Sequence, residues 1–342
     1  MIGNRIGNRE EKIKEILEEL GEPQFRLTQI NEALYGKGVL RYSEMLSLPQ
    51  TLRETLEHKL GSISSIKAIT TIKSINSTKV LFETCDGLPL ETVARPDFIC
   101  VSCQSGCAMK CAFCSTGRMG LGRSLSSDEI IDQVLYFKST GYKISNITFM
   151  GMGEPLLNLE AVVATILELT DPTKFGLGMR KISLSTVGIV PGIKRMAELL
   201  PQINLAFSLH SPYEAERQRL MPISTTYPLD EVMKALDEHA AATHRQIFLE
   251  YVLIKDVNDD AKHARDLATL VKNRPLPHLF YVNLIKFHAG NKDITFEAPE
   301  DRIAQTFLKI LKEKGINCSL RSSIGEGDYA ACGQLGAMID PR

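Results

Sequence analysis

Hydrophobic and polar positions alternate along the first part of the chain with a helical period. Residues 10–20 place Ile13, Ile16, Leu17 and Leu20 at the i, i+3, i+4 and i+7 spacing and end at Gly21, which predicts a short amphipathic helix. Two further helices are predicted at about 27–35 and 49–59, the second with Pro49 at a permitted first-turn position. These elements predict a small helical N-terminal domain over residues 1–62.

The period changes to that of β-structure over residues 63–94. Apolar, β-branched runs occur at 66–72, 80–83 and 89–93, and the turn residues Asp86 and Gly87 separate the last two runs. This pattern predicts a short antiparallel β adaptor between the helical domain and the rest of the chain.

From residue 95 strand-like and helix-like segments alternate regularly. A capping box, Ser126-x-x-Glu129, marks the start of one of the helices. Units of this length predict an α/β fold with a parallel sheet and right-handed crossovers over residues 95–342. The strands are expected at 98–102, 146–150, 181–186, 203–208, 247–254, 279–285 and near 316–321, and the helices at 127–139, 158–169, 191–200, 228–241, 259–272 and 300–314.

Composition restricts the class of protein. The 342 residues are 44% hydrophobic and 24% charged with a formal net charge of −1, as in an ordinary soluble globular protein, so any nucleic-acid surface must be a local patch. No apolar run reaches the roughly 18 residues that span a bilayer, and residues 1–8 lack a signal-peptide core. Five of the eight cysteines fall between positions 100 and 114, which indicates metal or redox chemistry in a reducing compartment. We expect a cytoplasmic protein without a membrane partner, and nothing in the sequence requires an oligomer.

Three of those cysteines, Cys107, Cys111 and Cys114, have the spacing Cys-x3-Cys-x2-Cys. Three thiolates from one loop can hold three corners of a [4Fe–4S] cluster and leave the fourth iron open for a small molecule, whereas electron-transfer clusters usually have four cysteine ligands. A zinc site is the alternative, because Cys-x2-Cys is a common zinc spacing and Cys100 or Cys103 could supply a fourth ligand.

Other polar residues follow the predicted strands at their carboxyl ends, where parallel α/β proteins build their sites. Glu154, in Met150-Gly-Met-Gly-Glu-Pro155, could bind an ammonium group, and this segment lacks the third glycine of a dinucleotide fingerprint. Ser185, Ser208 and His210 could bind ribose or a carboxylate, although each alone is more often a cap or a satisfied polar residue of a loop. The segment from Asn283 to His288 follows the sixth strand, so we expect one site at this edge.

Cys332 lies apart from the other cysteines, in Ala330-Ala-Cys-Gly-Gln-Leu335. A lone cysteine is usually a small buried hydrophobic residue. Here the glycine-rich surroundings favour an exposed loop in which a thiolate could act as a nucleophile. Cys85 and Cys318 lie in or beside strand patterns and are assigned to packing.

Taken together, the cysteine loop and these segments resemble the radical S-adenosylmethionine RNA methyltransferases of the RlmN/Cfr family, which act on adenine in 23S rRNA. The resemblance covers essentially the whole chain, and residues 127–137, 207–221 and 227–239 look closer to the Cfr branch. It implies a partial (βα)6 radical-SAM barrel for residues 95–342, with a C-terminal loop carrying Cys332, and an accessory RNA-binding role for the N-terminal domain.

The resemblance also implies a role for each matching residue. Cys107, Cys111 and Cys114 would hold the cluster, Cys332 would carry a methyl group, Cys100 would be its partner cysteine and Glu91 would accept a proton. His288 stands where the family usually has asparagine, Gly327 and Tyr329 occupy usually acidic positions, and Cys103 replaces a common serine. The expected S-adenosylmethionine contacts are Gly153, Glu154, Ser185, Ser208, Leu209, His210 and His288.

In the reaction that the family implies, Cys332 takes a methyl group from one S-adenosylmethionine, and a radical made from a second one activates that methyl group for addition to carbon 2 or carbon 8 of adenine. Attack by Cys100 on Cys332 then releases the product and leaves a disulfide, which an electron donor must reduce again. The target base must leave its stack, which favours flexible RNA. A radical enzyme for another substrate, such as a tRNA adenine, and a zinc-stabilised RNA-binding module without catalysis are the alternatives.

Overall fold

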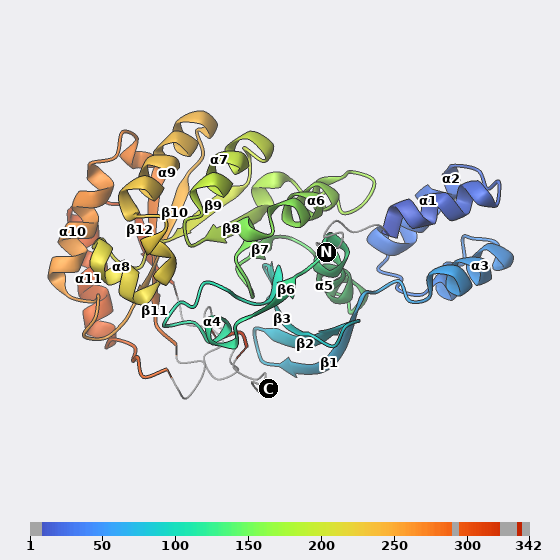
Figure 1. Cartoon of the computed structure of the whole chain (residues 1–342), viewed down its shortest axis with the longest axis horizontal. Coiled ribbons are helices and arrows are strands. Elements are labelled where there is room, and N and C mark those ends of the chain that lie inside the picture. Colours follow the sequence, from blue (N-terminus) through green and yellow to red (C-terminus); the bar gives the residue numbers. More distant parts are fainter. Residues whose placement is uncertain (1–8, 289–293, 322–333, 337–342) are drawn as a thin grey trace.

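One mixed sheet forms the body of the molecule (Figure 1). The computed structural model describes residues 9–288, 294–321 and 334–336, and within these it orders ten strands as β1-β2-β3-β4-β7-β8-β9-β10-β11-β12. From β4 onward neighbouring strands are parallel and follow chain order, as crossover connections require. The parallel strands are β4 (Ile99–Cys100), β7 (Ile147–Phe149), β8 (Ile182–Thr186), β9 (Asn204–Ser208), β10 (Ile247–Leu253), β11 (Phe280–Lys286) and β12 (Cys318–Leu320).

Helices cover the outer side of the parallel strands, in an arc that Figure 1 shows from α6 to α11. The predicted capping box is present at the start of α5: the Ser126 hydroxyl accepts from the Glu129 N–H at 3.2 Å, and the Glu129 carboxylate accepts from the Ser126 N–H at 2.8 Å. The α/β class and the partial-barrel order are confirmed. The helices are α5 (Ser127–Ser139), α6 (Leu159–Thr170), α7 (Val190–Leu199), α8 (Glu214–Leu220), α9 (Leu229–Thr243), α10 (Ala261–Lys272) and α11 (Asp301–Glu313).

The predicted β adaptor is the antiparallel edge of this same sheet. β1 (Ile66–Lys73), β2 (Thr78–Thr84) and β3 (Pro89–Ala94) form a meander, and β3 pairs with β4 through Val93 opposite Cys100. A short turn joins β3 to β4, so the antiparallel strands and the parallel strands share one hydrogen-bonded surface. Residues of β3 are thereby held next to the first strand of the barrel.

A small second sheet carries the cysteine loop. β5 (Gln104–Gly106) pairs antiparallel with β6 (Leu121–Ser124), and α4 (Ser115–Met119) lies between them in the chain. Gly106 has a φ of +75°, and a Cβ there would lie 1.9 Å from the carbonyl oxygen of Gly120. Only glycine fits this close approach of two backbones. The sequence patterns did not predict β5, β6, α4 or α8, because each is only three to seven residues long.

The N-terminal helices pack against each other and touch the barrel at α5 and α6. α1 (Arg9–Glu19), α2 (Phe25–Asn31) and α3 (Gln50–Leu60) are present near their predicted positions, while 32–36 form a π-helical turn in place of the end of the predicted second helix. Arg9 on α1 forms a buried ion pair with Asp132 on α5, and Tyr35 donates to Glu168 on α6 at 2.7 Å. These polar contacts fix the helical domain to one side of the barrel.

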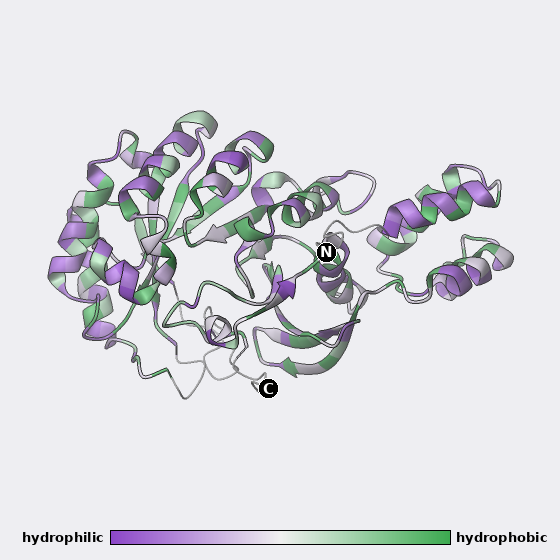
Figure 2. Ribbon diagram, viewed as in Figure 1, coloured by the Kyte–Doolittle hydropathy of each residue, from purple (hydrophilic) through white to green (hydrophobic). Residues whose placement is uncertain are grey.

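Apolar side chains fill the space between the sheet and its helices. Figure 2 shows largely hydrophobic strands and helices with one polar and one apolar side. Leu205, Leu249 and Leu284, on three neighbouring strands, are each at most 1% exposed. None of the helices in the described parts of the chain combines the length and apolarity needed to cross a membrane.

Candidate active site

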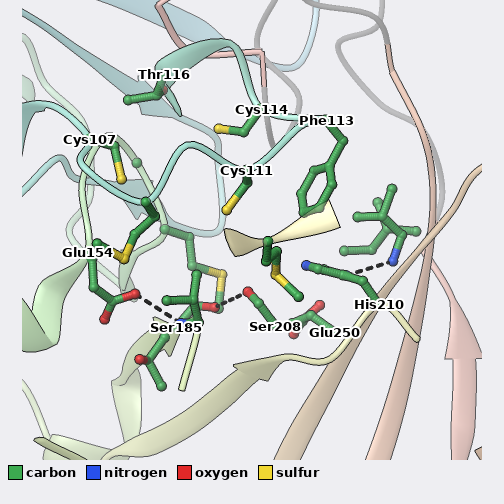
Figure 3. A pocket seen from close by; sticks show the side chains of 18 of the residues that line it. Cys107, Cys111, Phe113, Cys114, Thr116, Glu154, Ser185, Ser208, His210 and Glu250 are labelled. Carbon is green, nitrogen blue, oxygen red and sulfur yellow. Dashed lines mark hydrogen bonds between the residues drawn. The ribbon is translucent and has the colours of Figure 1, made fainter. Parts of the chain in front are cut away.

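The three cysteines of the loop face one pocket at the carboxyl ends of the parallel strands. Cys107, Cys111 and Cys114 line it from the loop between β5 and α4, and in Figure 3 their side chains point toward the strand ends that carry Glu154, Ser185 and Ser208. The loop is anchored at several points: Cys107 N–H donates to Gly120 at 2.8 Å and Ala112 N–H donates to Leu220 of α8 at 2.8 Å. The spacing of the motif therefore yields three convergent sulfur donors.

Burial raises the pKa of all three thiols. The pKa of Cys107 rises to about 12, and the pKa values of Cys111 and Cys114 also lie above the usual range, in each case chiefly through desolvation. Because the thiolate is the form that binds metal, this pocket favours ionised cysteines only when a cation compensates their charge. The donor set therefore fits a metal group.

The spacing of the three sulfurs bears on which metal group the loop would hold. Four ligands around one zinc ion place neighbouring sulfurs about 3.8 Å apart, given a zinc–sulfur bond of about 2.3 Å. Among the described residues, Cys107, Cys111 and Cys114 do not form a group with all ligand atoms within 4.8 Å of one another. Wider spacing fits an iron–sulfur cube, in which each thiolate binds a different iron.

Elsewhere in the described part of the chain, the possible ligand atoms of Cys85, Asp86 and Glu129 do lie within 4.8 Å of one another. The guanidinium of Arg123 already pairs with Asp86 at 2.6 Å and with Glu129 at 2.7 Å. The arginine thus supplies the positive charge that a cation would supply, and this group is an ion-pair cluster at the surface.

Glu154 lies opposite the cysteine loop and is 2% exposed. Its oxygens accept the N–H groups of Leu156 at 3.0 Å and Val187 at 2.9 Å, and burial raises the pKa of its carboxyl to about 7. Gly153 precedes it with a φ of +100°, and a Cβ there would lie 2.6 Å from Gln104. Glycine thus lets the strand end pass close to β5 and directs Glu154 into the pocket.

Ser185 and Ser208 line the same pocket at the ends of β8 and β9, with their hydroxyl oxygens 3.5 Å apart. His210 follows in a left-handed conformation with a φ of +56°. Its Nδ1 accepts the N–H of Val252 at 3.0 Å, and burial together with the charge of Arg217 lowers its pKa to about 3. The imidazole is therefore neutral and presents Nε2–H as a donor.

Of the two remaining predicted contacts of S-adenosylmethionine, one lines the pocket and the other does not. His288 lines the pocket beyond β11, whereas Leu209 is fully buried in the core and its N–H donates to the carbonyl of Glu250 at 3.0 Å. Leu209 can thus offer a ligand no side-chain contact in this arrangement.

Glu91 and Cys100 lie outside the pocket, on β3 and β4 respectively, and both are buried. Glu91 pairs with Lys79 at 2.7 Å and accepts the N–H of Gly336 at 2.8 Å. Cys332 lies outside the described residues, as do Gly327 and Tyr329.

A row of polar side chains crosses four strands beside the pocket, and the sequence analysis missed its members Glu250 and Ser319. Ser208, Glu250, Asn283 and Ser319 are in register on β9 to β12 and so lie on the same face of the sheet. Ser319 donates to Asn283 at 3.2 Å, Asn283 donates to Glu250 at 3.0 Å, and Glu250 and Arg321 line the pocket. In the sequence, the charged residue Glu250 within the otherwise apolar strand Ile247–Leu253 could have indicated this row.

The class of protein follows from a family comparison. Residues 101–268, which contain the cysteine loop, Glu154, Ser185 and Ser208, match the radical SAM superfamily, and residues 4–61 match the ribosomal RNA large subunit methyltransferase N-terminal domain. The chain is therefore a radical SAM protein with a partial barrel.

More similar relatives define the family. The chain is 42% identical to the ribosomal RNA large subunit methyltransferase Cfr of Staphylococcus aureus over 333 residues, covering 95% of each chain, and 40% identical to Cfr of Shouchella clausii over the same length. The crystal structure of a radical SAM methyltransferase from Sphaerobacter thermophilus superposes with a TM-score of 0.90 at 36% identity and covers 96% of this chain and 97% of that one. The chain belongs to the Cfr family of ribosomal RNA large subunit methyltransferases, and the expected radical SAM fold and resemblance are confirmed.

Proposed function

We propose that this protein methylates an adenine carbon, carbon 2 or carbon 8, of 23S rRNA by radical chemistry. The observation that carries the proposal is the convergence of Cys107, Cys111 and Cys114 with Glu154 and Ser208 on one pocket. Its relatives of the same length are large-subunit ribosomal RNA methyltransferases. The further partners are an electron donor and a flexible RNA, and we expect a monomeric enzyme in the reducing cytoplasm.

The cysteine loop would hold a [4Fe–4S] cluster through its three thiolates and leave one iron for S-adenosylmethionine. Bound together, these groups supply one-electron chemistry that can activate a methyl C–H bond, which the side chains of the protein cannot do. The protein contributes the ligands, the orientation of the bound molecule and a pocket shielded from water.

Glu154 would bind the ammonium group of S-adenosylmethionine. Its two oxygens are held by backbone N–H groups from both sides, so its position is set before a ligand arrives. A positive group beside it favours the ionised carboxylate and offsets the cost of burial. Ser185, Ser208 and the neutral His210 would bind ribose or carboxylate oxygens of the same molecule, and His288 would be a further contact at the mouth.

Cys332 would be the methyl carrier. The residues that follow it are anchored beside the pocket: the Thr116 hydroxyl donates to the carbonyl of Leu335 at 2.6 Å, and Gly336 donates to Glu91. Three residues of chain reach at most roughly 11 Å, so this anchor limits the distance of Cys332 from Thr116, two positions after Cys114.

Glu91 would accept the proton that the adenine carbon loses, and Cys100 would release the product by attack on Cys332. Oε2 of Glu91 is occupied by Lys79 and Gly336, while Oε1 has no hydrogen-bond partner in the parts of the chain described here. One oxygen is therefore held and the other is left to receive a proton.

Anaerobic reconstitution followed by mass spectrometry of 23S rRNA fragments tests this function. We expect bound iron, a methyl group on adenine, and no methylation by Cys332→Ala at unchanged iron content. Cys318→Ala, a substitution in β12, is the matched control and should retain activity. Stoichiometric zinc without iron would refute the radical function, and normal turnover by Cys332→Ala would refute the carrier role. Modification of tRNA alone would instead assign a different substrate.

A further inference from the structure

A fully buried arginine lies on α8, the helix whose residue Leu220 anchors the cysteine loop. Arg217, on α8, is 0% exposed and is among the largest fully buried side chains of the molecule. Its Nη1 donates to the carbonyls of Ser208, at 3.0 Å, and Leu209. Arg217 is absent from the pocket lining, so it does not touch a molecule bound there.

The positive charge of Arg217 lacks the partners that a buried charge usually has. In the described parts of the chain no carboxylate lies within ion-pair distance of it, and its Nε and Nη2 have no hydrogen-bond acceptor. Burial lowers the pKa of the guanidinium to about 10, which still leaves it charged at neutral pH. The guanidinium carbon lies 4.8 Å from the centre of the Phe207 ring, a cation–π contact that recovers part of the cost.

A buried, unpaired charge is expensive unless an opposite charge is nearby. The cysteine loop lies close to it: Arg217 donates to the carbonyl of Leu209, and the ring of the next residue, His210, lies 4.8 Å from the ring of Phe113 in the loop. The backbone joins the two segments as well, through the bond from Ala112 N–H to Leu220. Arg217 therefore lies near the cysteine loop without lining the pocket.

We propose that Arg217 is a positioning residue that acts as the buried counter-charge of the cysteine loop and sets the reduction potential of the cluster bound there. This inference rests on the proposed function, because it requires that Cys107, Cys111 and Cys114 hold an iron–sulfur cluster.

The direction of the effect follows from electrostatics. Reduction adds a negative charge to a cluster that already carries three thiolate ligands. A fixed positive charge in a low-dielectric surrounding stabilises the reduced state more than the oxidised state and raises the potential. Arg217 would thus ease the electron transfer that starts each reaction.

The test uses the full-length protein with its cluster reconstituted. Iron content and the midpoint potential are measured, the latter by a redox titration followed by electron paramagnetic resonance, for the unchanged protein and three variants. Arg217→Gln removes the charge but keeps a donor for the Ser208 and Leu209 carbonyls. Arg217→Lys keeps the charge on a different donor geometry. Arg219→Gln is the matched control, since it removes the same charge two residues along α8 from a side chain that is 77% exposed.

We expect Arg217→Gln to load iron and to shift the midpoint potential to a lower value. Arg217→Lys and Arg219→Gln should both stay close to the unchanged protein. A potential in iron-loaded Arg217→Gln equal to that of the unchanged protein would overturn the proposal and leave only a structural role.

If Arg217→Gln fails to fold or to load, the lysine variant decides. Iron loading of Arg217→Lys with an unchanged midpoint potential supports the counter-charge role. If Arg217→Lys also fails to bind iron, the hydrogen bonds of the guanidinium to the Ser208 and Leu209 carbonyls are essential, not its charge, and the proposal is overturned. Absence of iron from the unchanged protein would instead overturn the proposed function itself, so the two failures are distinguishable.

Discussion

The antiparallel part and the parallel part of the sheet each hold a buried carboxylate, and the two carboxylates differ in what compensates their charge. Glu154, beyond the parallel strand β7, accepts backbone N–H groups and has no basic side chain within ion-pair distance in the described parts of the chain. Glu91, on the antiparallel strand β3, is paired with Lys79 at 2.7 Å. A carboxylate held by neutral donors is left available to a cationic ligand, whereas one matched by lysine stays in place without a ligand. This difference supports the proposed roles, ligand binding for Glu154 and proton transfer for Glu91.

Removal of a cluster ligand should have the largest effect on the parallel region. Cys111→Ala is expected to lose bound iron and all methylation, because two thiolates remain where three are needed. Cys85→Ala, at an exposed cysteine near the antiparallel edge, is the control and should bind iron normally. Full iron content in Cys111→Ala would remove the loop from the cofactor site.

Removal of Lys79 should leave the buried carboxylate of Glu91 without its ion-pair partner. Lys79 and Glu91 are 3% and 0% exposed, so Lys79→Met leaves an unpaired buried carboxylate and should lower the free energy of unfolding by about 3–5 kcal/mol. Chemical denaturation measures this change. Lys255→Met, which breaks the exposed pair with Glu297, should have no measurable effect. Equal stability of the two variants would show that the pairing with Glu91 contributes nothing.

Neutralising Glu154 should weaken the binding of S-adenosylmethionine while the iron content stays unchanged. A hydrogen bond to a charged group contributes about 1.5–3 kcal/mol, so Glu154→Gln should raise the dissociation constant roughly 10- to 100-fold. Equilibrium dialysis with labelled S-adenosylmethionine provides the measurement. Glu91→Gln is the comparison variant and should bind the molecule normally; a similar loss in both variants would contradict the division between the two regions.

The smallest expected effect is a pH dependence that belongs to Glu154 alone. Burial raises the pKa of this carboxyl to about 7 in the ligand-free protein, and a bound ammonium group lowers that pKa. Affinity for S-adenosylmethionine should therefore fall as pH decreases below about 7 and level off above it, by linkage. Glu154→Gln should bind with no such slope. A slope that persists in Glu154→Gln would assign the titration to another group.

Long periodic segments of the fold could be predicted from the sequence, and short ones could not. The helix predicted at 127–139 has those bounds in the structure because a capping box and an apolar stripe agree there. The paired strands β5 and β6 have only three and four residues, too few for a hydrophobic period to show. The adaptor looked separate because its pairing with β4 depends on strand register, which no local pattern encodes.

The site also contains residues that the sequence could predict and residues that it could not. Motif spacing and position after strands predicted that the loop cysteines, Glu154 and Ser208 would share one site, and the structure places them around one pocket. Glu250 and Arg217 were missed because their importance arises from burial without a full set of partners, and burial is a property of the folded chain. The pairing of Glu91 with Lys79 likewise depends on the register of β2 and β3.

The hydrogen bonds that hold Leu335 and Gly336 limit the reach of the chain segment that precedes them. Thr116 and Glu91 bind the chain at Leu335 and Gly336, three and four residues after Cys332. The number of residues in between sets the greatest distance that position 332 can have from these two anchors. One inserted residue would change that length by about 3.4 Å, more than the length of a carbon–sulfur bond. For the carrier role that we propose for Cys332, the spacing of this short stretch would matter as much as the identity of the cysteine.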